Sequence, residues 1–345
     1  MAVFFVYAMR RVDCPDCGVT VERVPWAEGK GHLTTSYRWF LARWAKRLSW
    51  TDTAVAFNTT WENVFRSVKY AVLWGVAHRD LSGIEAIGVD EIQWRSGHTY
   101  LTLVYQITGC KRLLWVSHER TEQSLRKFFE ALTDDVRTGI RFVCSDMWRP
   151  YLNVIAEQIP QALHVLDRFH IMQKMNVAID EVRRQEVAQL RRDGYEPALT
   201  KSRWCLLKRP ENLTDNQATK LAELLQYNLK SVRAHLLREE FQRFWEYASP
   251  AWAGKFLESW CTRAIRSRLA PMKKVAKTLR RHRPLILNWF LALGAISAGI
   301  VEGFNGKAKL TTRKAYGFRT PQGIEIALLH VMGNLPEPTF THRFC

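Results

Sequence analysis

The spacing of hydrophobic positions from Ile84 onward is that of a β-sheet. Short apolar runs at 84–92, 99–107 and 112–117 are separated by the turn-forming sequences Arg95-Ser96-Gly97 and Thr108-Gly109, and they predict a three-stranded meander. Two later runs, IRFVCSD and LHVLD, alternate with helical stretches, including one helix over 121 to about 135 and another from 168 to about 192. Apolar runs that alternate with helices predict parallel strands added to the meander.

Before the sheet, residues 34–82 have helical spacing and are rich in tryptophan and arginine. Ser49 is a candidate helix cap, and Thr59-x-x-Glu62 predicts a capping box that opens a helix ending near Arg79. A shorter helix at about 52–57, broken at Asn58, precedes it. The pair predicts a helix-turn-helix of the kind that reads DNA.

After the sheet, residues 195 to about 290 predict a separate all-helical unit, punctuated by prolines at 210, 250 and 284. A further helix with a basic continuation is expected around ISAGIVEGFNGKAKLTTRKAYGFRT, and the tail LPEPTFTHRFC is expected to be disordered. These patterns divide the chain into six segments. The segments are 1–33, 34–82, 83–194, 195–290, 291–334 and 335–345.

The net charge of the chain indicates which kind of partner it binds. The 345 residues include 51 lysines and arginines against 33 acids, a formal charge of +18, and nucleic acid is the natural polyanion for such a chain. No apolar run approaches the roughly 20 residues that span a bilayer, so a membrane protein is not expected. The apolar opening MAVFFVYAM precedes its arginines and does not fit a signal peptide. Seven cysteines, mostly scattered singly, suit a reducing compartment, and we expect a cytoplasmic protein.

Two aspartates end apolar runs of the predicted sheet. Asp90 lies in GVDEI and Asp146 ends VCSD. Singly, each is best interpreted as a turn or helix-cap residue. Together they predict more, because adjacent parallel strands lie about 4.8 Å apart and two such carboxylates repel each other unless a cation compensates. Hard oxygen ligands favour Mg²⁺ or Mn²⁺, and two such ions about 4 Å apart drive phosphoryl displacement on nucleic acids.

A third carboxylate is indicated by the charge pattern near the C-terminus. Between Glu258 and Glu325 the chain has one acid, Glu302, among fourteen lysines and arginines. The alternative is a surface glutamate paired with a neighbouring lysine, a contact worth less than about 1 kcal/mol. On a helix, Glu302, Asn305 and Lys309 would share one stripe, which favours a metal ligand beside phosphate-binding groups.

The residues around this stripe also point to DNA. Gly299, Gly303 and Gly306 would lie on one side of the helix, where each costs about 1 kcal/mol relative to alanine, so they predict a close backbone approach to DNA or to the sheet. The basic residues that follow are expected to contact phosphates. They are Lys307, Lys309, Arg313 and Lys314.

At this point the motifs resemble those of ISL3-type insertion-sequence transposases, members of the DDE superfamily. The resemblance runs from about Val6 to Cys345 and rests on GVDEI, VCSDMWRPY, VLDRFHIM and, most specifically, GIVEGFNGKAKLTTRKAYGFRT. It implies an α/β fold with an RNase H-like mixed sheet flanked by helices and an all-helical insertion. It also implies Asp90, Asp146 and Glu302 as the DDE triad.

Two further features are compared with this family. Asp167 and His170 match a D-x-x-H signature of related transposases, which implies a role near the active site or DNA; the alternative is a helix-cap aspartate with a satisfied histidine. Relatives usually carry a zinc ribbon with two C-x-x-C pairs, whereas this chain begins just before the second pair, Cys14 and Cys17. We therefore expect a shortened chain, and Zn²⁺ binding is left open because structural zinc needs four ligands.

The sequence thus predicts a transposase that binds terminal inverted repeats and target DNA and acts as a homo-oligomer on DNA. It would cleave and join strands with Mg²⁺ at Asp90, Asp146 and Glu302. Two alternatives stay open, namely an RNase H-fold nuclease and a catalytically silent, DNA-binding relic that acts as a repressor. Tryptophans of the helical insertion could stack on an unpaired base, but most are expected in the core. They are Trp204, Trp245, Trp252 and Trp260.

Overall fold

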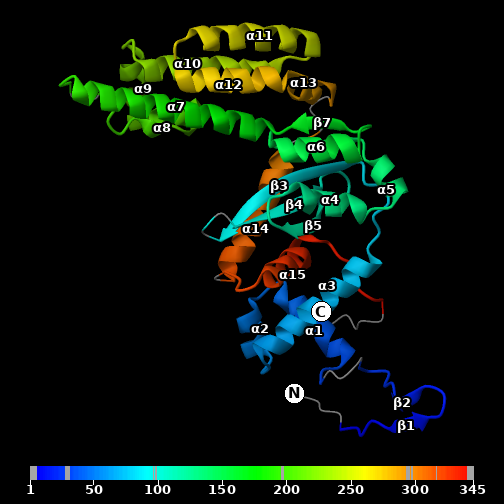
Figure 1. The fold of residues 1–345 in the computed structure, drawn as a ribbon. Coiled ribbons are helices and arrows are strands. Elements are labelled where there is room, and N and C mark those ends of the chain that lie inside the picture. Colours follow the sequence, from blue (N-terminus) through cyan, green and yellow to red (C-terminus); the bar gives the residue numbers. More distant parts are fainter. Residues whose placement is uncertain are drawn as a thin grey trace. The chain divides into compact units, whose positions relative to one another are not determined.

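Five strands form one mixed sheet in the order β5-β4-β3-β6-β7 (Figure 1). The structure is a computed structural model, and it describes residues 6–27, 32–95, 97, 99–195, 198–292, 296, 298–315 and 317–339. The strands of the sheet are β3 (Ala86–Arg95), β4 (Thr99–Gln106), β5 (Arg112–His118), β6 (Phe142–Ser145) and β7 (Leu163–Leu166).

The pairing of the strands confirms the predicted meander and the parallel additions. Strand β3 pairs antiparallel with β4, and β4 pairs antiparallel with β5. Strand β6 then pairs parallel with β3, and β7 pairs parallel with β6. The turns of the meander contain Gly97 and Gly109 at φ +82° and +61°, which only glycine adopts without steric cost. The sheet therefore brings the carboxyl ends of three adjacent strands, β3, β6 and β7, to one edge.

The two faces of the sheet are covered by different helices. Helices α4 (Glu122–Glu130) and α6 (Arg149–Gln158) bury apolar side chains against one face, in a core that includes Val89. The other face meets helix α14 (Ala298–Lys314). There the ring of Phe304 stacks on Tyr105 at 4.8 Å. Because side chains alternate along a strand, Asp90 faces α14 while its neighbour Glu91 faces the side of α4 and α6.

The long run from Thr121 was predicted as one helix, and this prediction was wrong. Helix α4 ends at Glu130, and a separate helix α5 (Asp134–Gly139) follows with Thr133 as its N-cap. The backbone of Thr133 is extended, as is usual for an N-cap residue, and this interrupts the first helix. Two aspartates follow in the first turn of α5, where the helix dipole favours acids, so a new helix starts there.

The helices that follow β7 form a bundle, and its core also includes Met147 and Leu166 from the sheet region. The long helix α7 (Arg168–Arg192) has the predicted bounds, and its apolar side packs into the same core as the helices that follow it. Those helices are α8 (Arg203–Leu207), α9 (Asp215–Leu225), α10 (Lys230–Gln242), α11 (Pro250–Arg266), α12 (Ala270–Arg281) and α13 (Arg283–Leu291), with short 3₁₀ turns η1 (Pro210–Asn212) and η2 (Arg243–Glu246). The predicted all-helical region is confirmed in its described residues, and α7 belongs to its core.

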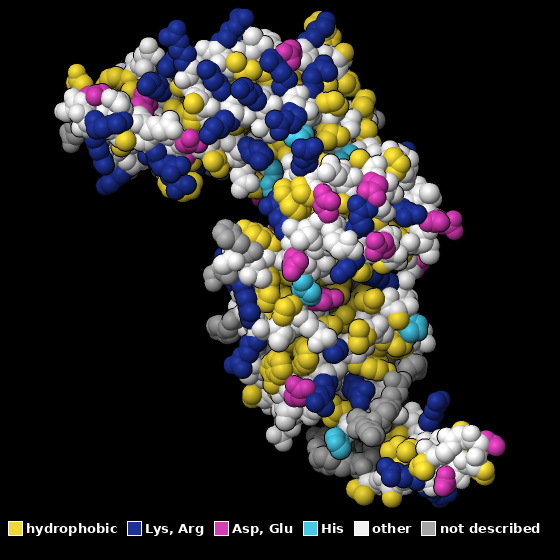
Figure 2. Space-filling view, viewed as in Figure 1, with side chains coloured by type: hydrophobic (Ala, Val, Ile, Leu, Met, Phe, Trp, Pro, Cys, Tyr) yellow, Lys and Arg dark blue, Asp and Glu magenta, His cyan; other side chains and the backbone are white. Residues whose placement is uncertain are grey.

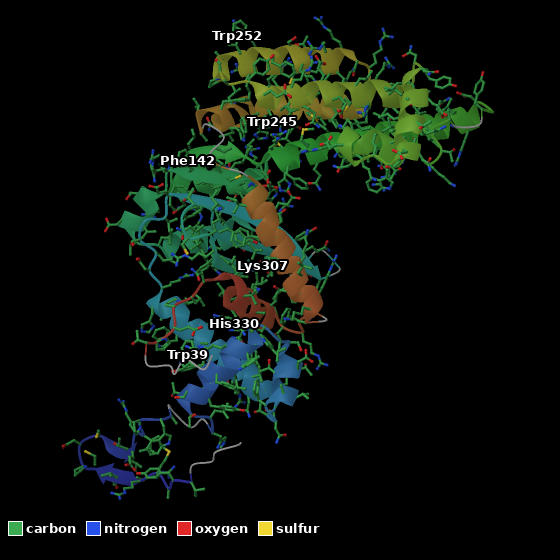
Figure 3. The ribbon with its side chains drawn as sticks, turned by 180° about the vertical axis from the view of Figure 1, so that it is seen from behind. Trp39, Phe142, Trp245, Trp252, Lys307 and His330 are labelled. Carbon is green, nitrogen blue, oxygen red and sulfur yellow. The ribbon has the colours of Figure 1, made fainter. Side chains whose placement is uncertain are left out.

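The four tryptophans of this bundle divide between core and surface. Trp260 is fully buried and donates its indole N–H to the carbonyl of Leu237 at 2.8 Å, and Trp245 is also buried. Trp204 and Trp252 are exposed (Figure 3 labels Trp245 and Trp252). A core role is therefore confirmed for the first two.

The N-terminal region contains a hairpin and three helices. The hairpin pairs β1 (Arg11–Cys14) with β2 (Gly18–Val21), and helices α1 (Thr35–Ala45), α2 (Trp50–Ala56) and α3 (Trp61–His78) follow. Helix α3 packs against α1, α2 and the late helix α15 (Pro321–Met332).

The caps of these helices correct one sequence prediction. Ser49 caps α2 as predicted, accepting from the N–H of Asp52 at 3.0 Å. The cap of α3 is Thr60, which accepts from the N–H of Asn63 at 3.2 Å, so the predicted capping box at Thr59 was wrong. Thr59 instead accepts from the Asn63 side chain at 3.1 Å. Two adjacent threonines are equally good caps by composition, and the backbone selects one.

The tail was also predicted wrongly for the part that the structure describes. Leu335 lies against Gly75 of α3, and Glu337 accepts from Arg43 at 2.7 Å and from Lys46 at 3.2 Å. Residues 335–339 are therefore packed, and the rest of the expected disordered tail lies outside the described residues. The apolar contact of Leu335 and the ion pairs of Glu337 with Arg43 of α1 and with Lys46, which directly follows α1, hold this segment.

The contacts divide the chain into two compact units. One comprises residues 1–80 and 307–345, and the other comprises residues 81–306. Among the residues that the structure describes, no helix is both long enough and apolar enough to cross a membrane.

Candidate active site

Three aspartates come from three adjacent strands. Asp90 lies in β3, Asp146 directly follows β6 and Asp167 directly follows β7. The register pairs Gly88 of β3 with Cys144 of β6, so Asp90 and Asp146 are each two residues beyond a paired position. Adjacent strands lie about 4.8 Å apart. The sheet therefore brings Asp90 and Asp167 near each other although 77 positions separate them in the sequence.

Asp90 is held from two sides. It is buried, with 7% of its surface exposed. Its Oδ1 accepts from the backbone N–H of Glu91 at 2.7 Å, and its Oδ2 accepts from the side-chain amide of Asn305 on α14. Asn305 in turn accepts from the hydroxyl of Tyr105 at 2.9 Å. The side chain of Asn305 therefore ties α14 to the predicted catalytic strand.

Asp146 is also fixed by two donors. Its Oδ1 accepts from the backbone N–H of Trp148 at 2.8 Å, and its Oδ2 lies 3.3 Å from Nη2 of Arg120. Burial raises the pKa of Asp146, and the charge of Asp90 adds to this, although the Trp148 hydrogen bond and the cations His170 and Arg120 oppose it. The carboxylate is thus a partly desolvated charge in an acidic cluster.

Asp167 and His170 lie in the same cluster as Asp90, and their expected role near the active site or DNA stays a prediction. Asp167 is the N-cap of α7 and accepts from the N–H of Phe169 at 2.6 Å, so the helix-cap interpretation also holds. Nε2 of His170 lies 3.7 Å from Oδ1 of Asp90 and 3.8 Å from Oδ2 of Asp167. Burial raises the pKa of Asp167 to about 6, with the charges of Asp90 and Glu302 contributing and that of His170 opposing.

His170 acts as a cation among these acids. Burial alone would lower its pKa, but the contact with Asp90 and the charges of Asp90, Asp167 and Asp146 outweigh burial and raise the pKa to about 9. The imidazole is therefore protonated at neutral pH, and it offsets part of the negative charge of the cluster.

Glu302 faces the cluster from the first half of α14. Its side chain is exposed, and it makes no hydrogen bond or ion pair with any residue that the structure describes. Its charge nevertheless contributes to the raised pKa of Asp167, which places it within electrostatic reach of that aspartate. Of the predicted triad, Asp90 is thus buried and Asp146 half-buried, and both are held by hydrogen bonds, whereas Glu302 is exposed.

The donor chemistry of the cluster fits a divalent cation. Carboxylate oxygens are hard ligands. Burial raises the pKa of Asp146 and of Asp167, and the charge of Asp90 adds to both shifts, so a bound cation would favour the charged form of both carboxyls. In the described part of the chain, no three His, Cys, Asp or Glu side chains are already arranged to hold a metal ion. That Asp90, Asp146 and Glu302 hold such an ion stays a prediction.

Sequence reasoning missed two residues of the site, Glu91 and Arg120. Nη2 of Arg120 lies 2.7 Å from Oε1 of Glu91, and the guanidinium lies over the ring of Trp148 at 4.4 Å. Burial, reinforced by Asp146, raises the pKa of Glu91 to about 7. Glu91 was visible in GVDEI but points to the opposite face of β3, and Arg120 lies in a loop with no distinguishing spacing.

The predicted DNA-contacting residues of α14 differ in their surroundings. Asn305 is buried against Asp90, and its expected contact with DNA stays a prediction. The four cations that follow it are all exposed, and Nζ of Lys314 donates to the carbonyl of Arg47 at 2.7 Å. They are Lys307 (labelled in Figure 3), Lys309, Arg313 and Lys314.

Gly303 and Gly306 of α14 do not make the expected close approach to the sheet, and a close approach to DNA stays a prediction. A Cβ built at Gly303 or Gly306 would meet no atom within 4 Å, so neither glycine is required for packing on the sheet. The close approach between α14 and the sheet occurs instead at a glycine of the sheet. A Cβ at Gly88 of β3 would lie 2.5 Å from Cγ2 of Val301. The glycine that admits α14 to the sheet is therefore Gly88.

The candidate zinc residues lie on the exposed hairpin. Cys14 and Cys17 are both free thiols, and a hydrogen bond from Cys17, together with backbone donors, lowers the pKa of Cys14. A lowered pKa favours the thiolate, which is the metal-binding form. Zinc binding stays a prediction.

Comparisons with known proteins agree with these features. An ISL3-type DDE family model, described as a transposase, matches residues 87–327. The chain is 33% identical over 315 residues to the transposase for insertion sequence element IS1001 of Bordetella parapertussis, covering 90% of this chain and 76% of that protein. It is 30% identical over 367 aligned positions to the transposase for insertion sequence element IS1557 of Mycobacterium tuberculosis, covering 99% and 81%.

A solved structure, the Drosophila P element transposase strand transfer complex, is similar with a TM-score of 0.42 and 8% identity, covering 88% of this chain and 92% of that one. The assignment does not depend on this weak likeness, because the family model covers most of the chain and both sequence relatives are matched over more than two thirds of their length. The chain therefore belongs to the ISL3 family of DDE transposases.

Proposed function

We propose that this chain is the catalytic transposase of its insertion sequence. It cuts DNA at the ends of the element and joins them to target DNA in a reaction that depends on Mg²⁺ or Mn²⁺. Asp90, Asp146 and Glu302 form the triad on an RNase H-like core. The observation that carries the proposal is the hydrogen bond from Asn305 to Asp90, because it holds the helix of Glu302 against the strand that carries Asp90.

The metal supplies the chemistry that side chains alone lack: when bound, it activates an attacking water or 3′-hydroxyl and stabilises the leaving oxygen of an in-line displacement. The chain's own residues hold the ligands in place. Asn305 and the N–H of Glu91 fix both oxygens of Asp90, while Arg120 and the N–H of Trp148 fix those of Asp146. Preorganised ligands avoid the cost of ordering them when the metal and DNA bind.

The positive side chains of the site have a second use in this proposal. His170 is protonated and lies between Asp90 and Asp167, so it limits the repulsion that would otherwise spread the carboxylates apart. Arg120 does the same between Glu91 and Asp146. Both are positioning residues, since the ion pairs that they form in this structure are with acids.

Recognition of the element is assigned to the N-terminal helices. Helices α2 and α3 are joined by the four residues Phe57–Thr60, with Asn58 at φ +47°, which is the connection length of a helix-turn-helix. We propose that this pair binds the terminal inverted repeats and that a homo-oligomer brings two ends together. The cations of α14 would contact phosphates of the bound DNA.

The proposal is tested with a labelled DNA fragment that carries the element's own ends. Incubation with the purified chain and Mg²⁺ is expected to give cleaved ends with 3′-hydroxyls and, with added target DNA, joined products. Cleavage without joining would support an RNase H-fold nuclease instead. Specific binding without cleavage, under conditions where Mn²⁺ also fails, would support a DNA-binding relic and overturn the catalytic proposal.

A further inference from the structure

Helix α12 presents a row of cations to solvent. Its other side is buried in the bundle through Met272, Val275, Ala276 and Leu279 and packs against α7 and α11. The exposed side carries Lys274, Lys277 and Arg281, spaced three and four residues apart and thus aligned along one face. We refer to these three residues as the α12 basic face.

Two neighbouring cations of the bundle are neutralised by acids, but those of the α12 basic face are not. Arg280 pairs with Glu258 at 2.6 Å, and Arg263 pairs with Glu240. The side chains of Lys274, Lys277 and Arg281 make no ion pair or hydrogen bond with any described residue. Three aligned like charges repel one another, so a folded chain that keeps them unpaired gains from an anionic partner.

The charge extends beyond the row itself. The half-buried His282 has its pKa lowered by burial, with the charges of Arg281 and of Lys174 on α7 acting in the same direction, so cations from two helices meet at this end of α12. Figure 2 shows Lys and Arg side chains gathered over the helical bundle, with few acids among them.

We infer that the α12 basic face binds the phosphate backbone of duplex DNA without reading its sequence. The inference rests on the proposed function, which requires the chain to hold DNA, and it adds a second holding surface away from the triad. Lys274 and Arg281 lie seven residues apart, about 10 Å along the helix, a length that spans about three phosphates of one strand.

The chemistry of the face favours phosphates over bases. Lysine and arginine contact phosphates irrespective of sequence, and the neighbouring polar side chain Thr278 donates its hydroxyl to the carbonyl of Lys274 at 3.0 Å. Asn or Gln side chains, which would pair with adenine, are absent from the sequence of α12. The expected DNA is therefore target or flanking duplex rather than the terminal repeats.

The test is a triple variant, Lys274→Gln, Lys277→Gln and Arg281→Gln, in the full chain. Glutamine has similar helix propensity, so circular dichroism and thermal unfolding should match the wild type. Binding to a random duplex is measured by fluorescence anisotropy between about 50 and 200 mM salt. We expect the slope of log affinity against log salt to fall in magnitude by about 0.9 for each phosphate that the variant no longer neutralises, and affinity at about 100 mM salt to fall at least about tenfold.

A matched control changes the same charge elsewhere, through Lys111→Gln, Lys127→Gln and Arg141→Gln, three exposed cations of the sheet region. An unchanged slope in the α12 variant, or an equal loss in the control, would overturn the inference. So would a loss confined to DNA with the element's ends, or a loss seen with anionic lipid vesicles while DNA binding is unchanged. Wild-type cleavage is scored separately, so failure of the proposed catalysis is distinguishable from failure of this surface.

Discussion

At the scale of single residues, the site is an acidic cluster balanced by the protein's own cations. Arg120 and His170 lie against Asp146 and Asp90, yet the pKa of Asp146 is still raised by burial. A buried acidic cluster is costly to maintain for folding alone, since each desolvated charge opposes stability. The proposed function accounts for this cost, because metal-dependent strand cleavage needs hard oxygen ligands close together.

Replacing Asp90, Asp146 or Glu302 singly by alanine is expected to lower the cleavage rate at least about a hundredfold, because each loss removes a proposed ligand of the ions that drive the displacement. DNA binding should stay within about twofold of the wild type, since these residues serve the reaction rather than docking. Rates on the element's ends and anisotropy on the same DNA check both halves. A variant that cleaves at the wild-type rate would remove its residue from the triad.

A second residue-scale prediction concerns His330 of α15, which is buried in a cavity also lined by Trp39 (both labelled in Figure 3). Neither of its ring nitrogens has a hydrogen-bond partner among the described residues. Burial, with a contribution from the charge of Lys46, lowers its pKa to about 3, against 6.5 when unfolded. The unfolded chain therefore takes up this proton first, so the stability that neutral His330 provides is complete above pH 6.5 and is lost as pH falls from 6.5 toward 3.

His330→Leu should consequently make stability less sensitive to acid. Between pH 7.5 and 5.5 the free energy of unfolding of the variant is expected to fall by about 1 kcal/mol less than that of the wild type. Urea unfolding at both pH values measures the difference, and His78→Gln, at an exposed position, is the control. Parallel pH profiles for wild type and His330→Leu would show that this histidine titrates normally in the folded chain.

At the scale of elements, strands and helices with regular apolar spacing were predicted well. The exact residues at which helices begin and end were predicted poorly. The meander, the parallel strands and the bounds of α7 follow from apolar spacing that tertiary packing reinforces. Two details were missed, the break between α4 and α5 and the choice of Thr60 over Thr59 as a cap. Both depend on differences of about 1 kcal/mol in the free energy of helix capping at neighbouring residues, and residue types alone do not resolve such differences.

The candidate site shows the same division. Asp90 and Asp146 were accessible to prediction because they lie on adjacent strands of the predicted sheet, whereas Asp167 was indicated only by the family resemblance. Glu91 and Arg120 were not, because Arg120 reaches the site from a loop through a contact that leaves no periodic trace. The buried position of Asn305 was also missed, since a helical stripe does not reveal which of its members turns toward the sheet.

The docking of α14 on the sheet gives a prediction at this scale. Gly88→Ala would place a methyl group 2.5 Å from Cγ2 of Val301 and 3.2 Å from Cγ2 of Ile107, so α14 must shift. Overpacking of this kind typically costs about 1–3 kcal/mol. The variant should be destabilised by that amount, as urea unfolding would measure, and it should cleave more slowly because Glu302 and Asn305 move with the helix.

The matched control is Gly306→Ala on the same helix, where the added methyl group meets no atom within 4 Å. It should be neutral or stabilising by up to about 1 kcal/mol, since alanine is the better helix former. Equal stability of the Gly88→Ala variant and the wild type would contradict the tight docking of α14. A loss of DNA affinity in Gly306→Ala, without loss of stability, would instead support the expectation that this glycine admits a DNA backbone.

At the scale of the whole molecule, the charge of +18 makes binding to DNA a sum of many phosphate contacts. The cations of α14 are expected to supply part of this sum, because Lys307, Lys309 and Arg313 are exposed and form no ion pair with a described residue.

Replacing any one of these three cations by glutamine should weaken binding to specific and random duplexes alike and lower the magnitude of the salt slope by about 0.9. Lys314 is expected to show a smaller effect, because its ammonium group already donates to the carbonyl of Arg47 at 2.7 Å. Anisotropy titrations at four or more salt concentrations resolve such a change, whereas a single affinity does not. Slopes that stay unchanged for Lys307, Lys309 and Arg313 would place the phosphate path elsewhere on this basic chain.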